Sequence, residues 1–388
     1  MAKAVIVDAL RTPLGRFGGG LLEFSAGDLA THVLRALVER NSVRPAEVDE
    51  VLLGQVLQGG DGNLARKAAA AAGLPVTVCG TTVNMACASG MKALDLARQA
   101  ILLGEGRLYL AGGAESMSNA PYYLQELRWG NRLGNVALRD AVMEEGLCCP
   151  LTGQGMGAIA EKIAVRTGIT REEMDACALR SHQRALTAQA EGRFADEILP
   201  VPRRKAEPLA VDEQPRETSV EALAQLRPAF APEGCVTAGN SSGINDGAAA
   251  VLLAEEGYAR EQGWRPRATL LASATAGAEP EALDLAPAAA VRKLCAHLGV
   301  APGDFELVEF NEAFAVQALS ALRDLGLDEA RVNVNGGGIS LGHPLGATGA
   351  RLVVTLLHEM EKRELRLGLA ALCIGGGMGM AMALQREA

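Results

Sequence analysis

Large aromatic side chains are scarce in this sequence: Phe, Trp and Tyr together make up 3% of the 388 residues. A core built around large rings is therefore excluded. Alanine is abundant and there are 45 glycines, so we expect small residues to pack closely between helices and sheets. With 49% hydrophobic residues, the chain can bury one large core or two of ordinary size.

Cysteines at metal-binding spacing are missing as well. The eight cysteines include no CxxC pair, and they are too sparse for a disulfide scaffold. This pattern argues against structural zinc and against a small secreted domain stapled by disulfides. We therefore expect no metal site.

No apolar stretch reaches the ~18 residues that a membrane span requires, so no membrane association is expected. The first apolar run is short and soon meets Asp8, Arg11 and Pro13, which is typical of a first strand and not of a signal peptide. The expected location is a reducing cytoplasm.

Positive charge is in deficit. Lys and Arg total 37 against 46 Asp and Glu, which gives a formal net charge of −9. Such a chain lacks the broad basic surface of a nucleic-acid-binding protein, and no nucleic-acid partner is expected. A local basic cluster is still available to bind an anion; it comprises Arg203, Arg204, Lys205 and Arg216.

Short strand-like runs alternate with helix-like ones along the chain. Residues 5–7, 51–54 and 108–111 are short and apolar, and the last run is expected to end at Gly112-Gly113. Residues 29–38 and 91–103 have helical spacing, and Ser25 and Asp28 are plausible capping residues for the first of these helices. This alternation predicts a layered α/β fold.

The sequence also contains a weak internal duplication. An apolar strand, a polar loop, a helix and a glycine-ended strand follow one another in residues 48–113 and again in residues 305–377. Two related α/β halves are therefore expected. We predict an N-terminal half over 1–118, completed by about 241–265, and a C-terminal half over 266–388. Residues 119–240 would form an inserted loop domain, folded over the first half and suited to binding substrate.

Cys87 follows an apolar strand and begins a probable helix. Backbone N–H groups and the helix dipole at that position would lower the pKa of the thiol and make its sulfur a better nucleophile. Small neighbours, Ala86, Ala88, Ser89 and Gly90, leave the sulfur accessible. The simpler alternative is a buried cysteine acting as a small hydrophobic side chain.

Three further segments carry candidate catalytic groups. Asn311-Glu312 follows a strand-like run, where polar side chains can orient substrate or water; the alternative is a helix cap with a solvated Glu. His343 lies in a glycine-rich run that is neither a P-loop nor a dinucleotide-binding fingerprint. Cys373 precedes three glycines, and a thiol in such a turn can move a proton while neighbouring N–H groups stabilise an oxyanion.

Taken together, the segments NMACASG (84–90), NEAF (311–314), GGGISLGHPLGATGAR (336–351) and CIGGGMG (373–379) resemble the four signature blocks of the thiolases. VDALRTPLGRFGG, RPAF and GCVTAGNSSGINDGAAA are also similar to that family, so the resemblance covers nearly the whole chain. It implies a thiolase-like layered αβαβα fold and an acyltransferase acting on CoA thioesters.

The resemblance also implies roles for individual residues. Cys87 matches the nucleophile that carries the acyl group, and His343 matches the base that activates it. Cys373 matches the acid/base that moves protons at the α-carbon and at the leaving thiol. Asn311 matches the residue that holds a water, which forms one oxyanion hole with His343. The backbone N–H groups of Cys87 and Gly375 would form the other.

Coenzyme A would be a substrate, so no cofactor is implied. The matching CoA or substrate contacts are Met156, Arg216, Phe230, Ala238, Ser242, Ala313 and Phe314. One position departs from many short-chain members: Gly155 stands where they have a His before the methionine. This departure predicts room for a longer acyl chain.

Two other functions share the scaffold. A decarboxylating ketoacyl synthase would use two His or His and Asn in place of a second Cys, whereas this chain has Cys373. A non-catalytic acyl-CoA or lipid carrier would be expected to lose Cys87, His343 or Cys373. The family resemblance further implies a homotetramer built as a dimer of dimers.

Overall fold

The computed structural model describes residues 2–386, and its centre is one mixed ten-stranded sheet. The strand order is β10-β11-β12-β9-β1-β8-β5-β3-β4, with β2 (Gly15–Arg16) paired beside β8. The N-terminal part contains β1 (Ala4–Arg11), β3 (Glu50–Gly54), β4 (Cys79–Val83), β5 (Leu108–Ser116) and β8 (Asn245–Glu255). The C-terminal part contains β9 (Ala268–Gly277), β10 (Leu307–Phe310), β11 (Leu367–Ile374) and β12 (Met378–Arg386).

The two parts of the sheet have the same internal order. In one, β3 lies parallel to β5, followed by antiparallel β8 and then β1. In the other, β10 lies parallel to β11, followed by antiparallel β12 and then β9. Only Val5–Thr269 and Ile6–Ala268 pair between β1 and β9, so the parts join at a narrow seam. This repeat of strand order supports two related halves. We propose that they comprise residues 1–118, completed by about 241–265, and residues 266–388.

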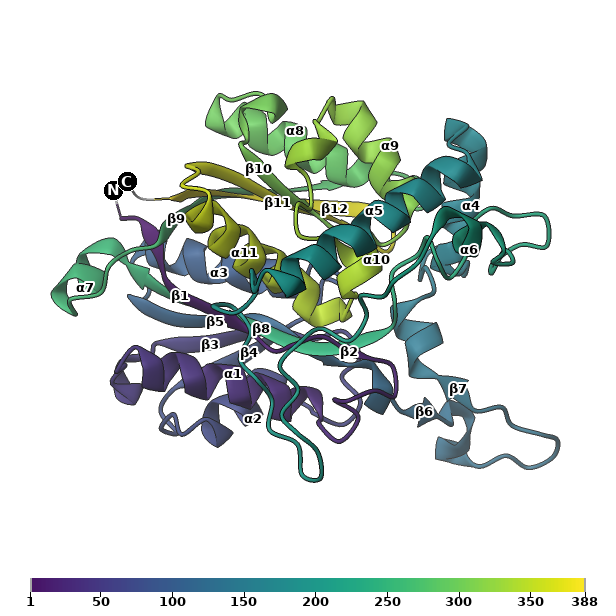
Figure 1. Ribbon diagram of the computed structural model, residues 1–388. Helices are drawn as coiled ribbons and strands as arrows, with labels where there is room; N and C mark the ends of the chain where they lie inside the picture. The colour runs from purple at the N-terminus through teal and green to yellow at the C-terminus, as the bar shows by residue number, and fades with distance from the viewer. Residues whose placement is uncertain (1, 387–388) are drawn as a thin grey trace.

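Two helices fill the space between the halves of the sheet (Figure 1). α3 (Ser89–Leu103) and α11 (Leu345–Lys362) contact each other; α3 also contacts β3 and β5, and α11 contacts β5, β8, β10 and β11. α1 (Ala26–Arg40) and α2 (Leu64–Ala71) cover the outer face of the N-terminal half. α8 (Leu285–Leu298) and α9 (Ala315–Leu325) cover that of the C-terminal half. The expected αβαβα layering is confirmed.

Local sequence explains several boundaries. Ser25 and Asp28 form a capping box at the start of α1, as predicted. β5, however, does not end at Gly112-Gly113 but continues to Ser116. A Cβ on Gly112 would lie 2.1 Å from the Ala249 carbonyl oxygen, so glycine is present because a neighbouring strand packs closely and not because the chain turns.

The inserted segment contains β6 (Tyr122–Tyr123), β7 (Arg139–Asp140), the π-helical turn η4 (Val142–Gly146), α4 (Met156–Thr167), α5 (Arg171–Ala190) and α6 (Val220–Ala224). This segment, expected to fold over the first half, also packs against the second half. α4 and α5 contact α9, and α5 also contacts α10 (Gly338–Leu341), both in the second half. Apolar positions on α4 and α5, including Ile159 and Met174, share one core cluster with Val316 of α9.

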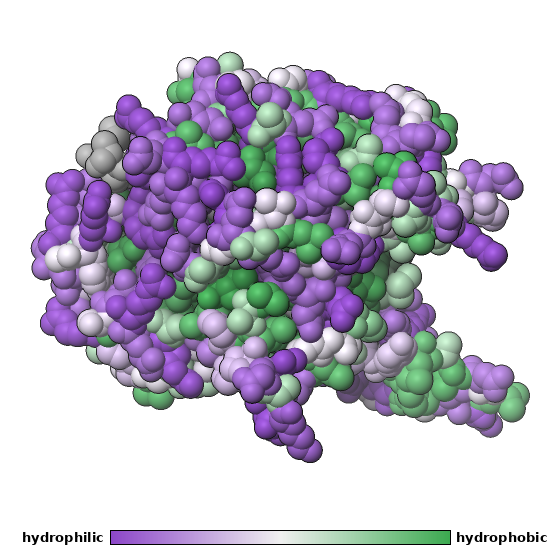
Figure 2. Space-filling view, viewed as in Figure 1, coloured by the Kyte–Doolittle hydropathy of each residue, from purple (hydrophilic) through white to green (hydrophobic). Residues whose placement is uncertain are grey.

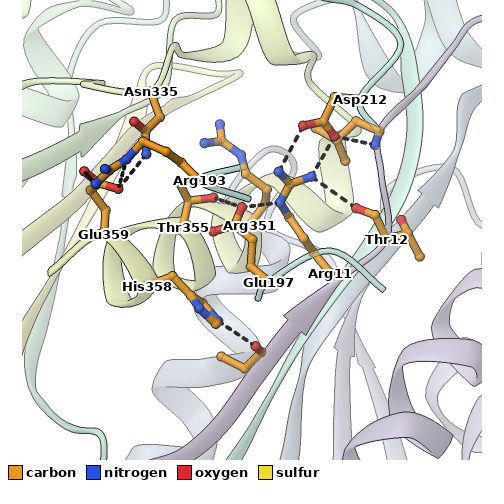
Figure 3. Close-up of polar contacts among 12 residues, drawn as sticks. Arg11, Thr12, Arg193, Glu197, Asp212, Asn335, Arg351, Thr355, His358 and Glu359 are labelled. Atoms are coloured by element: carbon orange, nitrogen blue, oxygen red, sulfur yellow. Dashed lines mark hydrogen bonds and ion pairs between the residues drawn. The ribbon is translucent and has the colours of Figure 1, made fainter. Parts of the chain in front are cut away.

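A later part of the same segment is tied to the first half by buried charges (Figure 3). The Arg11 guanidinium, fully buried at the end of β1, donates to Glu197 at 2.6 Å and to Asp212 at 2.6 and 2.9 Å. Thr355 of α11 donates to the same Glu197 carboxylate. The insertion therefore links both halves near the middle layer.

Residues 2–386 contain neither a candidate membrane span nor a candidate metal site. None of the helices there is long and apolar enough to cross a membrane. No group of three or more His, Cys, Asp and Glu side chains in this range is placed to hold a metal ion.

Candidate active site

Loops at the ends of four strands and at the starts of two central helices surround a cavity of about 640 Å³. Every residue predicted for the site lines it except Asn311, which lies behind His343. The predicted residues on its wall are Cys87, Met156, Arg216, Phe230, Ala238, Ser242, Ala313, Phe314, His343, Cys373 and Gly375. Of the basic cluster, only Arg216 reaches the cavity; Arg203 donates to the Glu207 carbonyl and Arg204 pairs with Glu23.

A strained turn presents Cys87 to the cavity. β4 ends at Val83, and Ala86 adopts φ 45°, a left-handed conformation that is rare for a residue with a Cβ. The Ser89 hydroxyl stabilises the turn by donating to the Ala86 carbonyl and accepting from the Met85 N–H. Cys87 is half-buried just before α3, which agrees with its predicted place and opposes the reading of an inert core cysteine.

The predicted direction of the Cys87 pKa is wrong. Burial raises the pKa of this thiol to about 11, although hydrogen bonds from the backbone N–H groups of Gly375 and Cys87 oppose the rise. The Glu115 carboxylate raises it further. Cys87 is therefore a neutral thiol at rest and requires a base to become a nucleophile.

His343, on the wall of the same cavity, carries a ring that is able to act as such a base. Its Nδ1 lies 2.7 Å from the Thr348 hydroxyl, which donates its own hydrogen to the Pro344 carbonyl at 2.8 Å. The hydroxyl must therefore accept from Nδ1–H, which leaves Nε2 as an acceptor. Burial, together with the Arg351 cation, lowers the pKa of His343 to about 3, so the ring is neutral and able to accept a proton.

Asn311 and Glu312 follow β10, and neither has the alternative role of a helix cap or a solvated charge. Asn311 is fully buried, and its Nδ2 approaches His343 Nε2 at 3.5 Å. The buried Glu312 accepts from Ser181 Oγ at 2.7 Å and from Asn333 Nδ2 at 2.8 Å. Glu312 thus anchors the loop that places Asn311 behind the base.

Cys373 lies on strand β11, paired with Gly379, and not in a turn as predicted. The turn begins after Ile374, where Gly376 and Gly377 have φ of 88° and 76°. Cys373 is 1% exposed, and burial with the nearby Cys87 sulfur raises its pKa well above the usual range. The strand fixes this thiol on the cavity wall, and the turn directs the Gly375 N–H toward the Cys87 sulfur.

A large part of the cavity wall is formed by the insertion and by residues 238–244. The Phe230 and Phe314 rings meet edge to face, with centroids 6.0 Å apart. Ser242 N–H donates to the Ala313 carbonyl at 2.9 Å, which ties the two loops together. Arg216 supplies an exposed positive charge, so this part of the wall combines apolar surface with one cation.

Sequence reasoning missed several residues that shape the cavity. The apolar wall beyond Cys87 includes Met117, Met143, Leu147 and Leu345. No local motif marks these residues, because they are brought together from three separate segments. Thr348 lies in the block 336–351 and was given no role of its own, yet it orients His343.

Comparison with known proteins gave consistent results. Residues 4–257 match the thiolase N-terminal domain and residues 264–386 match the thiolase C-terminal domain. The chain is 50% identical to the acetyl-CoA acetyltransferase of Chromobacterium violaceum, over 99% of this chain and 100% of that protein. It is 47% identical to the acetyl-CoA acetyltransferase of Escherichia coli, over 100% of both chains.

A solved structure agrees in three dimensions. The crystal structure of the Bacillus anthracis acetyl-CoA acetyltransferase superposes with a TM-score of 0.97 at 45% identity. The match covers 100% of this chain and 99% of that one.

Proposed function

Because this chain belongs to the thiolase family, we propose that it is an acetyl-CoA acetyltransferase that works through an acyl-Cys87 intermediate. The reaction is the condensation of two acetyl-CoA molecules to acetoacetyl-CoA and CoA; its reverse is CoA-dependent cleavage of a 3-ketoacyl-CoA. The observation that carries the assignment is the presence of two thiols and a neutral imidazole on the wall of one cavity.

In the first half-reaction, His343 Nε2 accepts the Cys87 proton while the sulfur attacks the thioester carbonyl. The developing oxyanion accepts hydrogen bonds from the N–H groups of Cys87 and Gly375. When the carbonyl re-forms, the C–S bond to CoA breaks and the departing thiolate takes a proton from Cys373. Acyl-Cys87 and free CoA result.

In the second half-reaction, the Cys373 thiolate removes a proton from the α-carbon of a second acetyl-CoA. His343, now protonated at Nε2, would stabilise the enolate oxygen together with a water held by Asn311. The enolate carbon attacks the acyl carbon on Cys87, and the C–S bond to Cys87 breaks. The Cys87 sulfur recovers its proton from His343 as acetoacetyl-CoA is released.

CoA and acyl-CoA are the proposed small-molecule partners. The pantetheine chain would lie along Met156, Phe230, Ala238, Ser242 and the Ala313-Phe314 pair, with Arg216 toward the anionic end. The matching positions and the apolar lining with one cation support this placement. CoA acts here as a substrate, and no resident cofactor is invoked.

The direct test follows the enolate absorbance of acetoacetyl-CoA after addition of free CoA. A CoA-dependent loss of that absorbance, with appearance of acetyl-CoA, is expected. Decarboxylation of a malonyl thioester in its place would indicate a ketoacyl synthase. Binding without turnover would indicate a carrier.

We also propose a homotetramer, built as a dimer of dimers, that acts in the cytoplasm. The β6–β7 excursion supports the assembly: it protrudes from the body and carries apolar surface (Figure 2). Trp129 and Leu133 on it are 92% and 93% exposed, which is typical of residues that a partner covers. Eight free cysteines fit a reducing compartment. Light scattering that finds only the 40.4 kDa monomer at micromolar concentration would contradict the tetramer.

A further inference from the structure

A buried carboxylate that the mechanism does not use, Glu115, lies at the junction of three active-site elements. It is at the end of β5 and is fully buried. Its Oε2 accepts from the N–H groups of Val56 at 3.0 Å and Gly346 at 2.8 Å, and its Oε1 accepts from Leu57 N–H at 3.1 Å. Within residues 2–386 no lysine, arginine or histidine pairs with it, so backbone donors alone compensate its charge.

The three donors come from the segments that hold the reacting groups. Val56 and Leu57 follow β3 and belong to a small apolar cluster that packs against Cys87. Gly346 lies in the first turn of α11, three residues after His343. A carboxylate at that turn also faces the positive end of the helix dipole.

Gly346 also touches the helix that follows the nucleophile. A Cβ on Gly90 would lie 2.8 Å from the Gly346 carbonyl oxygen, and one on Gly346 would lie 2.9 Å from Glu115 Oε2. Gly90 is three residues after Cys87. The segments that carry His343 and Cys87 therefore meet at the contact between Gly346 and Gly90. Glu115 holds Gly346 in this contact by accepting from its N–H.

We propose that Glu115 is a positioning residue for acyl transfer: its carboxylate holds the start of α11, and with it His343, in register with Cys87, and its negative charge opposes resting thiolate at Cys87. The proposal rests on the thiolase function above and adds a residue to it. Glu115 does not line the cavity, so it acts through the groups that it holds and not through substrate.

The charges around Glu115 and Cys87 agree with both parts of the proposal, the positioning of His343 and the opposition to a resting thiolate at Cys87. Burial raises the pKa of Glu115 to about 7 against the three backbone hydrogen bonds, and Asp246 on β8 raises it further. Cys87 shares the cavity wall with His343 and Cys373, accepts from the Gly375 N–H, and is close enough to Glu115 to be affected by its charge. Of these, Glu115 is the one whose charge raises the Cys87 pKa.

The test compares Glu115→Gln with Glu115→Asp at pH 8, where the wild-type carboxylate is mostly ionised. Gln keeps the size but removes the charge and one acceptor; Asp keeps the charge but is one methylene shorter. Both should lower kcat for cleavage of acetoacetyl-CoA about tenfold or more, with KM for CoA within threefold of wild type. A lower kcat with a nearly unchanged KM is expected because Glu115 positions His343 and does not position the residues that contact CoA.

Alkylation of Cys87 by iodoacetamide, measured on its peptide by mass spectrometry, distinguishes the proposed role of Glu115 from a general disruption of the site by the substitution. The sulfur displaces iodide and its proton passes to buffer, so the rate follows the thiolate fraction. The Gln variant should react about three- to tenfold faster than wild type, and the Asp variant at the wild-type rate. Glu306→Gln is the control: Glu306 accepts two backbone N–H groups, from Arg366 and Leu367, at the opposite end of β10.

Glu115→Gln with kcat within twofold of wild type would overturn the proposal. A fall in kcat of Glu115→Gln without faster alkylation of Cys87 would also overturn it, because that result would indicate a general loosening of the site and no effect of the Glu115 charge. If Glu115→Gln does not fold, Glu115→Asp decides: kcat within twofold of wild type refutes the proposal, and a tenfold fall with unchanged alkylation supports it. If the wild-type protein does not cleave acetoacetyl-CoA, the proposed function fails, and the alkylation rates still test the charge of Glu115.

Discussion

Gly155 offers a direct way to alter the width of the acyl pocket. It lines the cavity at the start of α4 with φ −63° and ψ 145°, an extended conformation that any residue can adopt. A Cβ built there meets only the Leu147 carbonyl oxygen, at 3.9 Å. Because Met156 N–H donates to the same carbonyl at 2.8 Å, the backbone is held and a new side chain would have a defined direction.

We expect Gly155→His to disfavour long acyl chains. If the ring takes the space of two methylenes, long substrates lose about 1.6 kcal/mol of apolar burial, which is about fifteenfold in kcat/KM. The wild-type enzyme should cleave acetoacetyl-CoA and also act appreciably on 3-ketoacyl-CoA of six or more carbons. The variant should lose the longer substrates more than the C4 one.

The assay measures kcat/KM across C4 to C16 3-ketoacyl-CoA substrates. Gly155→Ala adds only a Cβ and should lie close to wild type. Gly303→His, on an exposed turn with open space around it, controls for the general effect of the substitution. A wild-type enzyme confined to C4, with the same preference in Gly155→His, would refute the reasoning and show that residues 147–150 already fill the space.

Three further outcomes are expected. Cys87→Ala should show no acetyl adduct by mass spectrometry after incubation with acetyl-CoA, whereas Cys373→Ala should acylate slowly and not condense; an adduct on Cys373 with Cys87 unmodified would reverse the roles. His343 has a pKa of about 3 in the fold against an ordinary value near 6.5, so the unfolded chain binds its proton first and stability falls as pH drops from 6.5 to 3. At pH 5.5 this loss should be about 1 kcal/mol in urea unfolding and should be absent from His343→Asn. Arg11→Met leaves the buried Glu197 carboxylate without its partner and should lower the free energy of unfolding by about 3–5 kcal/mol; a change below 1 kcal/mol would contradict that.

Local signals in the sequence were sufficient for much of the architecture. The helix predicted over residues 29–38 lies within α1, because Ser25 and Asp28 form a capping box and apolar residues recur at helical spacing. The repeat of strand, loop, helix and strand corresponds to the shared strand order of the two halves. Cys87, His343 and Cys373 converge on one cavity because they lie on loops of the two repeated halves, and the insertion brings further predicted residues, such as Met156 and Phe230, to its wall.

What sequence reasoning missed depends on contacts between distant segments. The helix N-terminus at Cys87 suggested a lowered pKa, but burial outweighs the backbone donors, and burial is a property of the assembled cavity. Glu115 has no recognisable motif, since its partners lie near residues 56 and 346. Cys373 was assigned to a turn because three glycines follow it, whereas the apolar residues before it extend the strand through Ile374.

The protonation states of the site favour coupling of proton transfer to substrate binding. Both thiols have raised pKa values and His343 has a lowered one, so the resting site contains no formal charge on any of the three. A resting thiolate–imidazolium pair would be costly in this apolar cavity. In the proposed mechanism, the arriving thioester carbonyl would supply an oxygen that the Cys87 and Gly375 N–H groups can stabilise once it becomes negative. Charge separation then becomes favourable only with substrate in place, which also limits oxidation and alkylation of Cys87 in the empty enzyme.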